Sequence, residues 1–298
     1  MEGERKKVRK AIIAAAGFGT RFLPQTKAMP KEMLPLVDKP IIQHIVEELV
    51  DAGIEDVVIV TGYHKRSIED HFDNMSAELR ANLRKAGKLE LLEQTKKISS
   101  LANFAYIRQK GLLGNGTPLI NAEHLVGDEP FIYAFADDFF EASPSRFRQM
   151  IDLYEKTGNS VISCIEVKED HDFERYGIVA GEQIDENTLR MTTIVEKPGK
   201  ENAPSNLASV SAYLFTPDYF YYLNKSMANV PEGQEFMIQP AMCDMVEDGK
   251  EILALKIING KYYDTGNKLE YLKTVIDFGL KDSKIHDGLL SYIRSVIQ

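Results

Sequence analysis

Short apolar runs alternate along the chain with stretches of helical spacing, and this alternation constrains the fold more than any other feature. The runs that are typical of strands are Ala11–Ala16, Asp56–Gly62, Phe104–Arg108, Phe131–Ala136 and Val161–Val167. They lack an in-and-out alternation of apolar and polar residues, so both faces of each strand are expected to be buried. The sequence therefore predicts an α/β fold of the Rossmann-like type, in which a mostly parallel sheet is flanked by helices.

Helical patterns fill the segments between these runs. Apolar residues recur with helical spacing over residues 42–50, and residues 76–98 predict one charged helix with its leucines on one side. A further helix is expected around residues 145–156. After about residue 170 the pattern changes to shorter strands and turns, and residues 267–298 are helical again. We therefore expect a smaller β region beside the main sheet and a C-terminal helical tail.

Composition narrows the classes of partner. The chain has 298 residues and a formal net charge of −9, with 44% hydrophobic and 27% charged residues, as in an ordinary globular domain. Domains that bind nucleic acid usually carry positive charge, so no nucleic-acid partner is expected. Cys164 and Cys243 have no paired-thiol or zinc-ligand spacing, so neither a disulfide nor a structural metal site is expected.

The N-terminal residues resemble the start of an export signal. Basic residues between Lys6 and Lys10 precede the apolar run Ala11–Ala16. That run is shorter than the roughly 7–15 apolar residues of a signal peptide, and it continues directly into a glycine loop. No other stretch approaches the ~18 uninterrupted apolar residues that a membrane span needs. We expect a cytoplasmic chain with no membrane partner.

The first predicted strand ends in the loop Gly17-Phe18-Gly19-Thr20-Arg21. Glycines at the carboxyl end of a first parallel strand let backbone N–H groups approach a phosphate closely, although an ordinary tight turn uses glycines in the same way. Phe22 stands where a dinucleotide fingerprint has its third glycine, and no Walker A lysine follows. Arg21 and Lys31 instead supply local positive charge, which an acidic chain needs in order to bind a triphosphate.

Aspartates follow two strand-like segments. Asp137 and Asp138 close the run Phe131–Ala136, and Asp264 lies in a Tyr-Asp-Thr-Gly segment. Acidic residues at the carboxyl end of a buried parallel strand lie in the ligand-binding crevice of an open sheet. A polar strand end for Asp137 and a helix N-cap for Asp264 are the alternatives. Mg²⁺ prefers one or two carboxylates together with phosphate oxygens and water, which favours pairing Asp137 with Asp264.

The longer pattern resembles the sugar-phosphate nucleotidyltransferase family. Gly17–Arg21, Pro30–Pro35 and Lys39-Pro40 carry this resemblance, and Phe22–Pro24 with Thr26–Ala28 are most similar to the bacterial UTP–glucose-1-phosphate uridylyltransferases. The resemblance covers nearly the whole chain. It implies UTP and glucose 1-phosphate as substrates, Mg²⁺ as cofactor, and a homodimer or homotetramer, because the family is commonly oligomeric.

The resemblance divides the chain into parts of one domain, 1–298. A nucleotide-binding part is expected at about 9–170, a sugar-side part at about 171–265, and C-terminal helices at about 267–298. The residues implied to bind the nucleotide are Ala15, Ala16, Gly17, Gly19, Thr20, Arg21, Glu32, Gln109, Gly114 and Asp137.

Base recognition is expected at Gln109 and Gly114. A glutamine amide offers a donor and an acceptor, which suits the N3–H and carbonyl edge of uracil. The family usually continues Gly-Leu-Gly-His-Ala, whereas this chain reads Gly-Asn-Gly-Thr-Pro from Gly114. Thr117 therefore replaces the histidine, and any role of that imidazole is lost.

The sugar side is expected around two further motifs, Arg175–Val179 and Val195–Pro198. The resemblance implies that Gly177 and Glu196 bind the sugar, while Lys197 meets its phosphate as a point charge. Taken alone, Glu-Lys-Pro is also a common surface turn.

A second departure from the family falls on the same side. Where the family reads Glu-Ile-Gln-Leu-Thr-Asp-Ala, this chain reads Glu-Phe-Met-Ile-Gln-Pro-Ala from Glu235, so Gln239-Pro240 replaces Thr-Asp. The departure bears on which sugar is bound and not on the type of reaction. A transferase for dTTP, CTP or another sugar 1-phosphate, and a non-catalytic UDP-sugar-binding homologue, remain open as alternatives.

The implied reaction is one in-line displacement. An oxygen of the sugar 1-phosphate attacks the α-phosphorus of UTP, and pyrophosphate leaves. Arg21, Lys31 and Lys197 are the implied catalytic residues, with Mg²⁺ held by Asp137 and Asp264.

Overall fold

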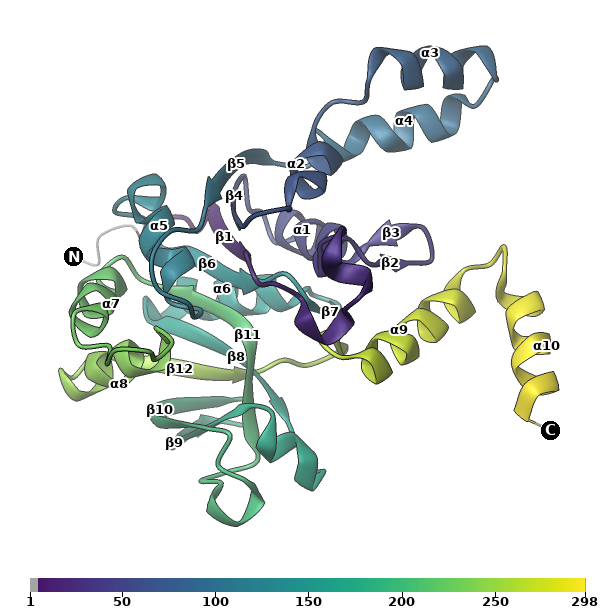
Figure 1. The fold of residues 1–298 in the computed structure, drawn as a ribbon. Coiled ribbons are helices and arrows are strands. Elements are labelled where there is room, and N and C mark those ends of the chain that lie inside the picture. Colours follow the sequence, from purple (N-terminus) through teal and green to yellow (C-terminus); the bar gives the residue numbers. More distant parts are fainter. Residues whose placement is uncertain (1–4, 298) are drawn as a thin grey trace.

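The computed structural model describes residues 5–297, except for the side chain of residue 211 (Figure 1). Its centre is one large sheet, built from strands β1 (Lys10–Ala15), β4 (Asp56–Thr61), β5 (Asn103–Arg108), β6 (Phe131–Phe135), β8 (Ser160–Glu166), β9 (Gly177–Asp185), β10 (Thr188–Glu196), β11 (Leu207–Phe215) and β12 (Ile252–Lys256). Their order across the sheet is β5-β4-β1-β6-β11-β8-β12-β10-β9. The predicted α/β fold class is confirmed.

Strand direction follows from the connections. β5, β4, β1 and β6 run parallel, with Ile12 of β1 opposite Val58 and Tyr133, because crossovers link these strands. β11 runs antiparallel between β6 and β8, and a short turn makes β9 and β10 an antiparallel pair. The half of the sheet from β5 to β6 is therefore parallel, as the sequence predicts, and the other half is mixed.

Some of the helices cover the two faces of the sheet, and others project from the body (Figure 1). The helices are α1 (Ile41–Asp51), α2 (Arg66–Phe72), α3 (Ala77–Lys85), α4 (Leu89–Ile98), α5 (Thr117–Val126), α6 (Arg146–Thr157), α7 (Tyr219–Met227), α8 (Gln239–Glu247), α9 (Lys268–Lys281) and α10 (His286–Ile297). Ile13 of β1 packs in the core on the side of α1 and α6, and its neighbour Ile12 packs on the side of α5, α7 and α8. Consecutive side chains thus enter opposite cores, which explains the uninterrupted apolar runs. In the described part of the chain no helix is both long and apolar enough to cross a membrane.

One expected helix is wrong in its extent. Residues 76–98 form two antiparallel helices, α3 and α4, and not one. Gly87 adopts a φ of 68°, in the left-handed region that ends a helix, and the chain turns back there. The resulting α3–α4 hairpin projects from the body of the molecule (Figure 1).

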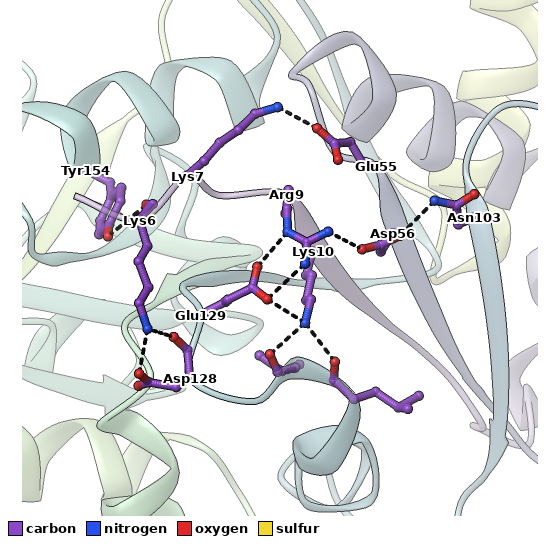
Figure 2. Close-up of polar contacts among 12 residues, drawn as sticks. Lys6, Lys7, Arg9, Lys10, Glu55, Asp56, Asn103, Asp128, Glu129 and Tyr154 are labelled. Atoms are coloured by element: carbon purple, nitrogen blue, oxygen red, sulfur yellow. Dashed lines mark hydrogen bonds and ion pairs between the residues drawn. The ribbon is translucent and has the colours of Figure 1, made fainter. Parts of the chain in front are cut away.

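The basic residues before β1 are bound to acidic neighbours at the amino ends of the strands (Figure 2). Lys6 pairs with Asp128 at 2.5 Å, and Arg9 contacts Glu129 at 2.7 Å and Asp56 at 3.0 Å. This cluster lies at the end of β1 opposite the glycine loop. Its positive charges are neutralised locally and do not serve a phosphate at the carboxyl end of the sheet.

Smaller elements shape the carboxyl edge. β7 (Asp138–Ala142) pairs antiparallel with β13 (Gly260–Asp264), and β2 (Pro35–Leu36) pairs with β3 (Lys39–Pro40). Short 3₁₀ turns occupy Thr20–Phe22, Gln25–Lys27, Lys31–Met33, Asp170–Glu174 and Lys200–Asn202. The β7–β13 register places Asp264 opposite Asp138, so two segments far apart in sequence meet beside the glycine loop.

Candidate active site

A cavity of about 710 Å³ opens at the carboxyl ends of β1, β4, β5 and β6. This volume falls within the usual range for a small-molecule site. Its lining comes from the loops that follow these strands and from the segment before α8: Ala14, Ala16, Gly17, Phe18, Thr20, Arg21, Lys31, Gly62, Tyr63, Gln109, Gly111, Leu113, Gly114, Asn115, Pro118, Phe135, Asp137, Glu235 and Met237. Most residues that the sequence assigns to the nucleotide are therefore brought together.

Three of the assigned residues lie outside this lining. Ala15 is fully buried in β1, and Gly19 faces Thr26. Glu32 is fully buried and pairs with Lys65, whose Nζ lies 2.6 Å from Glu32 Oε2. Burial raises the pKa of Glu32 and lowers the pKa of Lys65, against their mutual attraction. Contact of these three residues with a nucleotide stays a prediction, and Lys65 has no motif by which the sequence could have identified it.

The glycine loop folds back onto the turn that carries Lys31. Gly19 has a φ of 67°, and a Cβ there would come within 3.2 Å of Thr26 Cγ2. The hydroxyl of Thr26 donates to the carbonyl of Gly19 at 2.7 Å. A Cβ at Gly17 would lie 3.9 Å from Lys31 Cε. The loop is therefore held so that its backbone and the Lys31 side chain face the same cavity.

Lys31 and Asp137 form an ion pair in the cavity, with 2.5 Å between Nζ and Oδ2. Burial alone would raise the pKa of Asp137, but the positive charges of Lys31 and Arg21 outweigh it and hold that pKa below its usual value. Likewise, burial acts to lower the pKa of Lys31, and Asp137 with Glu32 raises it on balance. Both members of the pair are charged at neutral pH.

Asp264 lies beside Asp137. A Cβ built on Gly266 would stand 3.0 Å from Asp264 Oδ1 and 3.3 Å from Asp137 Oδ2, so both carboxylates flank one point. Thr265 fixes the arrangement, because its N–H and its hydroxyl both donate to the carbonyl of Asp137, at 3.0 and 2.6 Å. Arg21 Nη1 donates to the carbonyl of Gly266 at 3.3 Å.

The helix that follows Asp264 excludes the helix-cap alternative for this residue, and its role as a metal ligand stays a prediction. Asn267 is the N-cap of α9, and its side chain accepts from Glu270 N–H at 3.0 Å. Asp264 is not the cap, and it accepts from Gly266 N–H at 2.7 Å. The carboxylate of Asp264 therefore does not cap α9.

Arg175 and Tyr176 also contact Asp264, and the sequence assigned them no role. Arg175 forms an ion pair with the carboxylate, and the Tyr176 hydroxyl donates to it at 3.2 Å. Burial raises the pKa of Tyr176, so its hydroxyl keeps the proton that it donates. The sequence motif that contains Arg175 and Tyr176 could be identified, but its contact with Asp264, far away in the sequence, could not be predicted.

Asp138 points away from this pair, as the next residue of an extended segment does. It is buried with Arg146, whose Nη1 lies 3.4 Å from Asp138 Oδ1, and it accepts from the Tyr262 hydroxyl at 3.0 Å. Asp137 lines the larger cavity, while Asp264 lies beside Asp137 and lines neither cavity, so their joint binding of a cation stays a prediction. Within residues 5–297 no group of three or more His, Cys, Asp or Glu side chains could hold a metal, so a bound Mg²⁺ would need phosphate oxygens and water as well.

The loop around Gly114 packs against the segment before α8. A Cβ at Gly114, where φ is 117°, would come within 2.2 Å of the carbonyl oxygen of Phe236. Phe236 N–H donates to the carbonyl of Leu113 at 2.7 Å, and the Thr117 hydroxyl donates to the carbonyl of Leu112 at 2.8 Å. Thr117, which replaces the family histidine, is buried and closes this loop at the start of α5.

A smaller cavity of about 110 Å³ adjoins the first. Residues from β9, β10, β11 and the start of α8 line it: Asn115, Phe135, Arg175, Tyr176, Gly177, Ile194, Glu196, Ser209, Tyr213, Met237 and Gln239. Asn115, Phe135 and Met237 line both cavities, so the two cavities lie side by side.

Lys197 lies at the rim and lines neither cavity. Its side chain is 55% exposed, and its Nζ is 3.6 Å from Glu196 Oε1. Its φ of 49° is in the left-handed region, which is uncommon for a residue with a side chain and is found more often at functional sites. Its contact with a sugar phosphate stays a prediction.

Comparison with known proteins gives a consistent result. The family model described as nucleotidyl transferase matches residues 10–278. The chain is 47% identical over 292 residues to a UTP–glucose-1-phosphate uridylyltransferase of Bacillus subtilis (strain 168), covering 98% of each chain. It is 46% identical over 291 residues to the UTP–glucose-1-phosphate uridylyltransferase 2 of Staphylococcus saprophyticus, covering 98% of this chain and 99% of that one.

Solved structures agree with these relatives. A UDP-glucose pyrophosphorylase complexed with UDP-glucose superposes with a TM-score of 0.81 at 38% identity, covering 92% of this chain and all 100% of that one. A UTP-bound enzyme of the same type from Acinetobacter baumannii gives a TM-score of 0.86 at 34% identity, covering 96% and 98%. With the cavity at the strand ends and the match over most of its length, the chain belongs to the nucleotidyl transferase family.

Proposed function

We propose that this chain transfers UMP from UTP to glucose 1-phosphate and so makes UDP-glucose and pyrophosphate. The observation that carries the proposal is a pair of adjacent cavities. The larger one bears Arg21, Lys31 and Asp137, and the smaller one beside it bears Gly177 and Glu196. We assign the larger cavity to the nucleotide and the smaller one to the hexose. Relatives at 46–47% identity carry the name of this activity, and neighbouring structures contain UDP-glucose or UTP.

The larger cavity accounts for the nucleotide. Backbone groups of Gly17 and Thr20 border the space for phosphates, and Arg21 and Lys31 supply the charge that compensates them. Gln109 and Gly114 border the same cavity after the end of β5, and we assign them to the uracil edge because a glutamine amide offers both a donor and an acceptor.

The reaction needs no nucleophile from the protein. With both phosphates held in line, an oxygen of the sugar phosphate attacks the α-phosphorus, while Arg21 and Lys31 stabilise the charge of the departing pyrophosphate. Lys197 holds the sugar phosphate in position. Mg²⁺, held by Asp137 and Asp264, would offset the negative charge of the phosphates when bound. One displacement predicts inversion at phosphorus and sequential kinetics.

Three further inferences accompany this function. Mg²⁺ is the proposed metal because the two carboxylates present only hard oxygen ligands. We place the chain in the cytoplasm, where nucleoside triphosphates are available. We also propose a homodimer or homotetramer, because α10 has no buried residue within residues 286–297 and carries several apolar ones.

Pyrophosphate release measured over a panel of nucleotides and sugar 1-phosphates tests the function. We expect UTP with glucose 1-phosphate to give the highest kcat/KM, above dTTP or CTP and above other hexose 1-phosphates. A preference for another pair would assign the chain to a sister transferase. Clear UDP-glucose binding without turnover of any pair would make it a binding homologue. The joint presence of Arg21, Lys31, Asp137, Lys197 and Asp264 argues against that second outcome.

A further inference from the structure

Gln239 stands in the smaller cavity at a position where the sequence departs from its family. It is the first residue of α8 and lines the cavity together with Glu196. The residue before it, Ile238, is held by hydrogen bonds to both its N–H and its carbonyl group. Asn115 Oδ1 accepts from Ile238 N–H, and the Tyr219 hydroxyl donates to the carbonyl of Ile238, each at 2.9 Å. Pro240 follows and restricts the first helical turn. The side chain is therefore attached to a rigid point.

Glu196 fixes the orientation of the Gln239 amide. Gln239 Nε2 donates to Glu196 Oε2 at 3.2 Å. A carboxylate accepts hydrogen bonds and does not donate them, so the amide must present its NH₂ group to Glu196 and direct its carbonyl oxygen elsewhere. Gly177 leaves room for this contact, since a Cβ there would come within 3.1 Å of Glu196 Oε2.

In this orientation the side-chain carbonyl oxygen of Gln239 meets no hydrogen-bond donor in the described part of the chain. Gln239 Oε1 is buried and has no hydrogen-bond partner among the described residues. Buried polar atoms are nearly always bonded, so this exception in a binding cavity leaves an acceptor that a bound ligand can satisfy. The last torsion of a glutamine side chain has a broad energy profile, so the amide can adjust to a donor that enters the cavity.

A sugar offers the matching chemistry. Each hydroxyl carries one proton to donate, and neighbouring hydroxyls of a hexose can donate to neighbouring acceptors. Glu196 and Gln239 are such neighbours, one charged and one neutral. A neutral amide oxygen accepts from a hydroxyl without adding a second negative charge beside Glu196 or near the sugar phosphate.

We propose that Gln239 is a specificity-determining residue of this site, whose side-chain carbonyl accepts a hydrogen bond from one sugar hydroxyl while Glu196 accepts from the adjacent one. The inference rests on the proposed function, because it takes a hexose 1-phosphate as the occupant of the smaller cavity.

The test compares the whole enzyme with the Gln239→Met variant, which keeps the length of the side chain and removes its hydrogen bonds. Steady-state kinetics are measured with glucose 1-phosphate and with its monodeoxy analogues, each lacking one hydroxyl. The wild-type enzyme should use one of these analogues about tenfold less well than glucose 1-phosphate, and Gln239→Met should be about tenfold less efficient with glucose 1-phosphate itself. The variant should not discriminate further against that one analogue, and its KM for UTP should be unchanged.

Gln234→Met is the matched control, since Gln234 lies in the same connection before α8 but lines neither cavity. It should behave as the wild type with every analogue. If Gln239→Met discriminates among the analogues as the wild type does, Gln239 reads no hydroxyl and the inference is overturned, while the proposed function stands. If the wild type turns over no UTP with glucose 1-phosphate, the proposed function fails, and this inference fails with it.

Discussion

Charge balance at single residues explains how an acidic chain can hold a polyphosphate. Lys31 is paired with Asp137, and Arg175 is paired with Asp264, so the cations that surround the cavity are matched by the carboxylates that would hold a metal. The low pKa of Asp137 means that its charge does not depend on a metal being present. Phosphates and Mg²⁺ can therefore enter together. The negative charge of the phosphates compensates Arg21 and Lys31, and the positive charge of Mg²⁺ compensates Asp137 and Asp264.

Asp137→Asn and Asp264→Asn should each reduce turnover by at least about a hundredfold, because each removes one of the charges that hold Mg²⁺ against the phosphates. Pyrophosphate release at limiting and at saturating Mg²⁺ measures the loss, and the thermal melting temperature checks that the fold is retained. Asp128→Asn is the control, because Asp128 is an exposed aspartate at the amino ends of the strands. Near-normal rates at limiting Mg²⁺ would show that the substituted residue is not a ligand.

Lys197→Ala should weaken the use of glucose 1-phosphate about ten- to a hundredfold and leave the KM for UTP unchanged, because a charge-assisted contact to phosphate is worth roughly 1.5–3 kcal/mol. Arg21→Ala should show the opposite bias and impair the triphosphate side most. Lys200→Ala is the matched control, since Lys200 is exposed nearby and pairs with Asp170. Unchanged sugar-phosphate kinetics in Lys197→Ala would return Glu-Lys-Pro to an ordinary surface turn.

At the scale of elements, sequence patterns predicted the strands and the residues at their ends, but they did not predict the contacts between distant segments. The apolar runs and their glycine or acidic ends are properties of neighbouring residues, so the parallel strands and the positions of Gly17 and Asp137 could be predicted. A single glycine within a helical pattern does not by itself predict a turn, so the break at Gly87 between α3 and α4 could not be predicted from spacing alone. The Lys65–Glu32 and Arg175–Asp264 pairs join segments that only the sheet order brings together, and no short sequence pattern encodes that order.

The junction of α1, β7 and α9 should make the stability of the fold dependent on pH. His44 of α1 stacks on Phe139 with 5.1 Å between ring centroids and meets Phe278 edge-on at 5.0 Å. Burial, the largest effect, lowers its pKa to about 4 from 6.5. As the pH falls from 6.5 toward 4, the unfolded chain binds a proton that the folded chain does not. The stabilisation, complete above 6.5, is therefore lost in that window, and unfolding should become about 2 kcal/mol easier between pH 7 and pH 5.

Urea unfolding of wild type and His44→Phe at both pH values checks this expectation. The variant keeps an aromatic ring in the junction and removes the proton site, so it should lose less stability at pH 5 than the wild type does. Some pH dependence of stability should persist in His44→Phe, because burial also lowers the pKa of His71. His124→Phe, on the exposed side of α5, should behave as the wild type. Equal losses in wild type and His44→Phe would show that His44 does not contribute.

At the scale of the whole molecule, apolar side chains remain exposed on the parts that project from the sheet. The α3–α4 hairpin and α10, at the end of the α9–α10 tail, both extend away from the body, whereas α9 packs against it (Figure 1). On the tail, Tyr292 is 65% exposed and Ile297 is 76% exposed. Exposed apolar residues gathered on one helix indicate a contact surface more often than isolated ones do. A helical pattern identifies an apolar face but not its partner, so the sequence alone does not say whether the tail packs on its own domain or on another subunit.

We expect a homodimer or a larger assembly in which α10 contacts another copy of this chain. Light scattering at micromolar concentration should give at least twice the 33.6 kDa mass of one chain. Replacing Tyr292 and Val296 of α10 by glutamate should reduce that mass to one chain, because two charges would be buried without partners at the interface. Circular dichroism should remain unchanged, since neither side chain is buried in the fold of one subunit.

The matched control for this experiment is Tyr221→Glu on α7, where an equally exposed tyrosine (67%) lies outside the tail. Its mass should equal that of the wild type. A wild-type mass of one chain would contradict the assembly, and an oligomer that survives both glutamates would place its interface elsewhere. The latter result would direct attention to the α3–α4 hairpin, the other projection on which leucines such as Leu89 are exposed. Neither Tyr292 nor Val296 lines the nucleotide cavity. If the lower mass of the double variant reflects the loss of assembly alone, the variant should therefore still bind UTP.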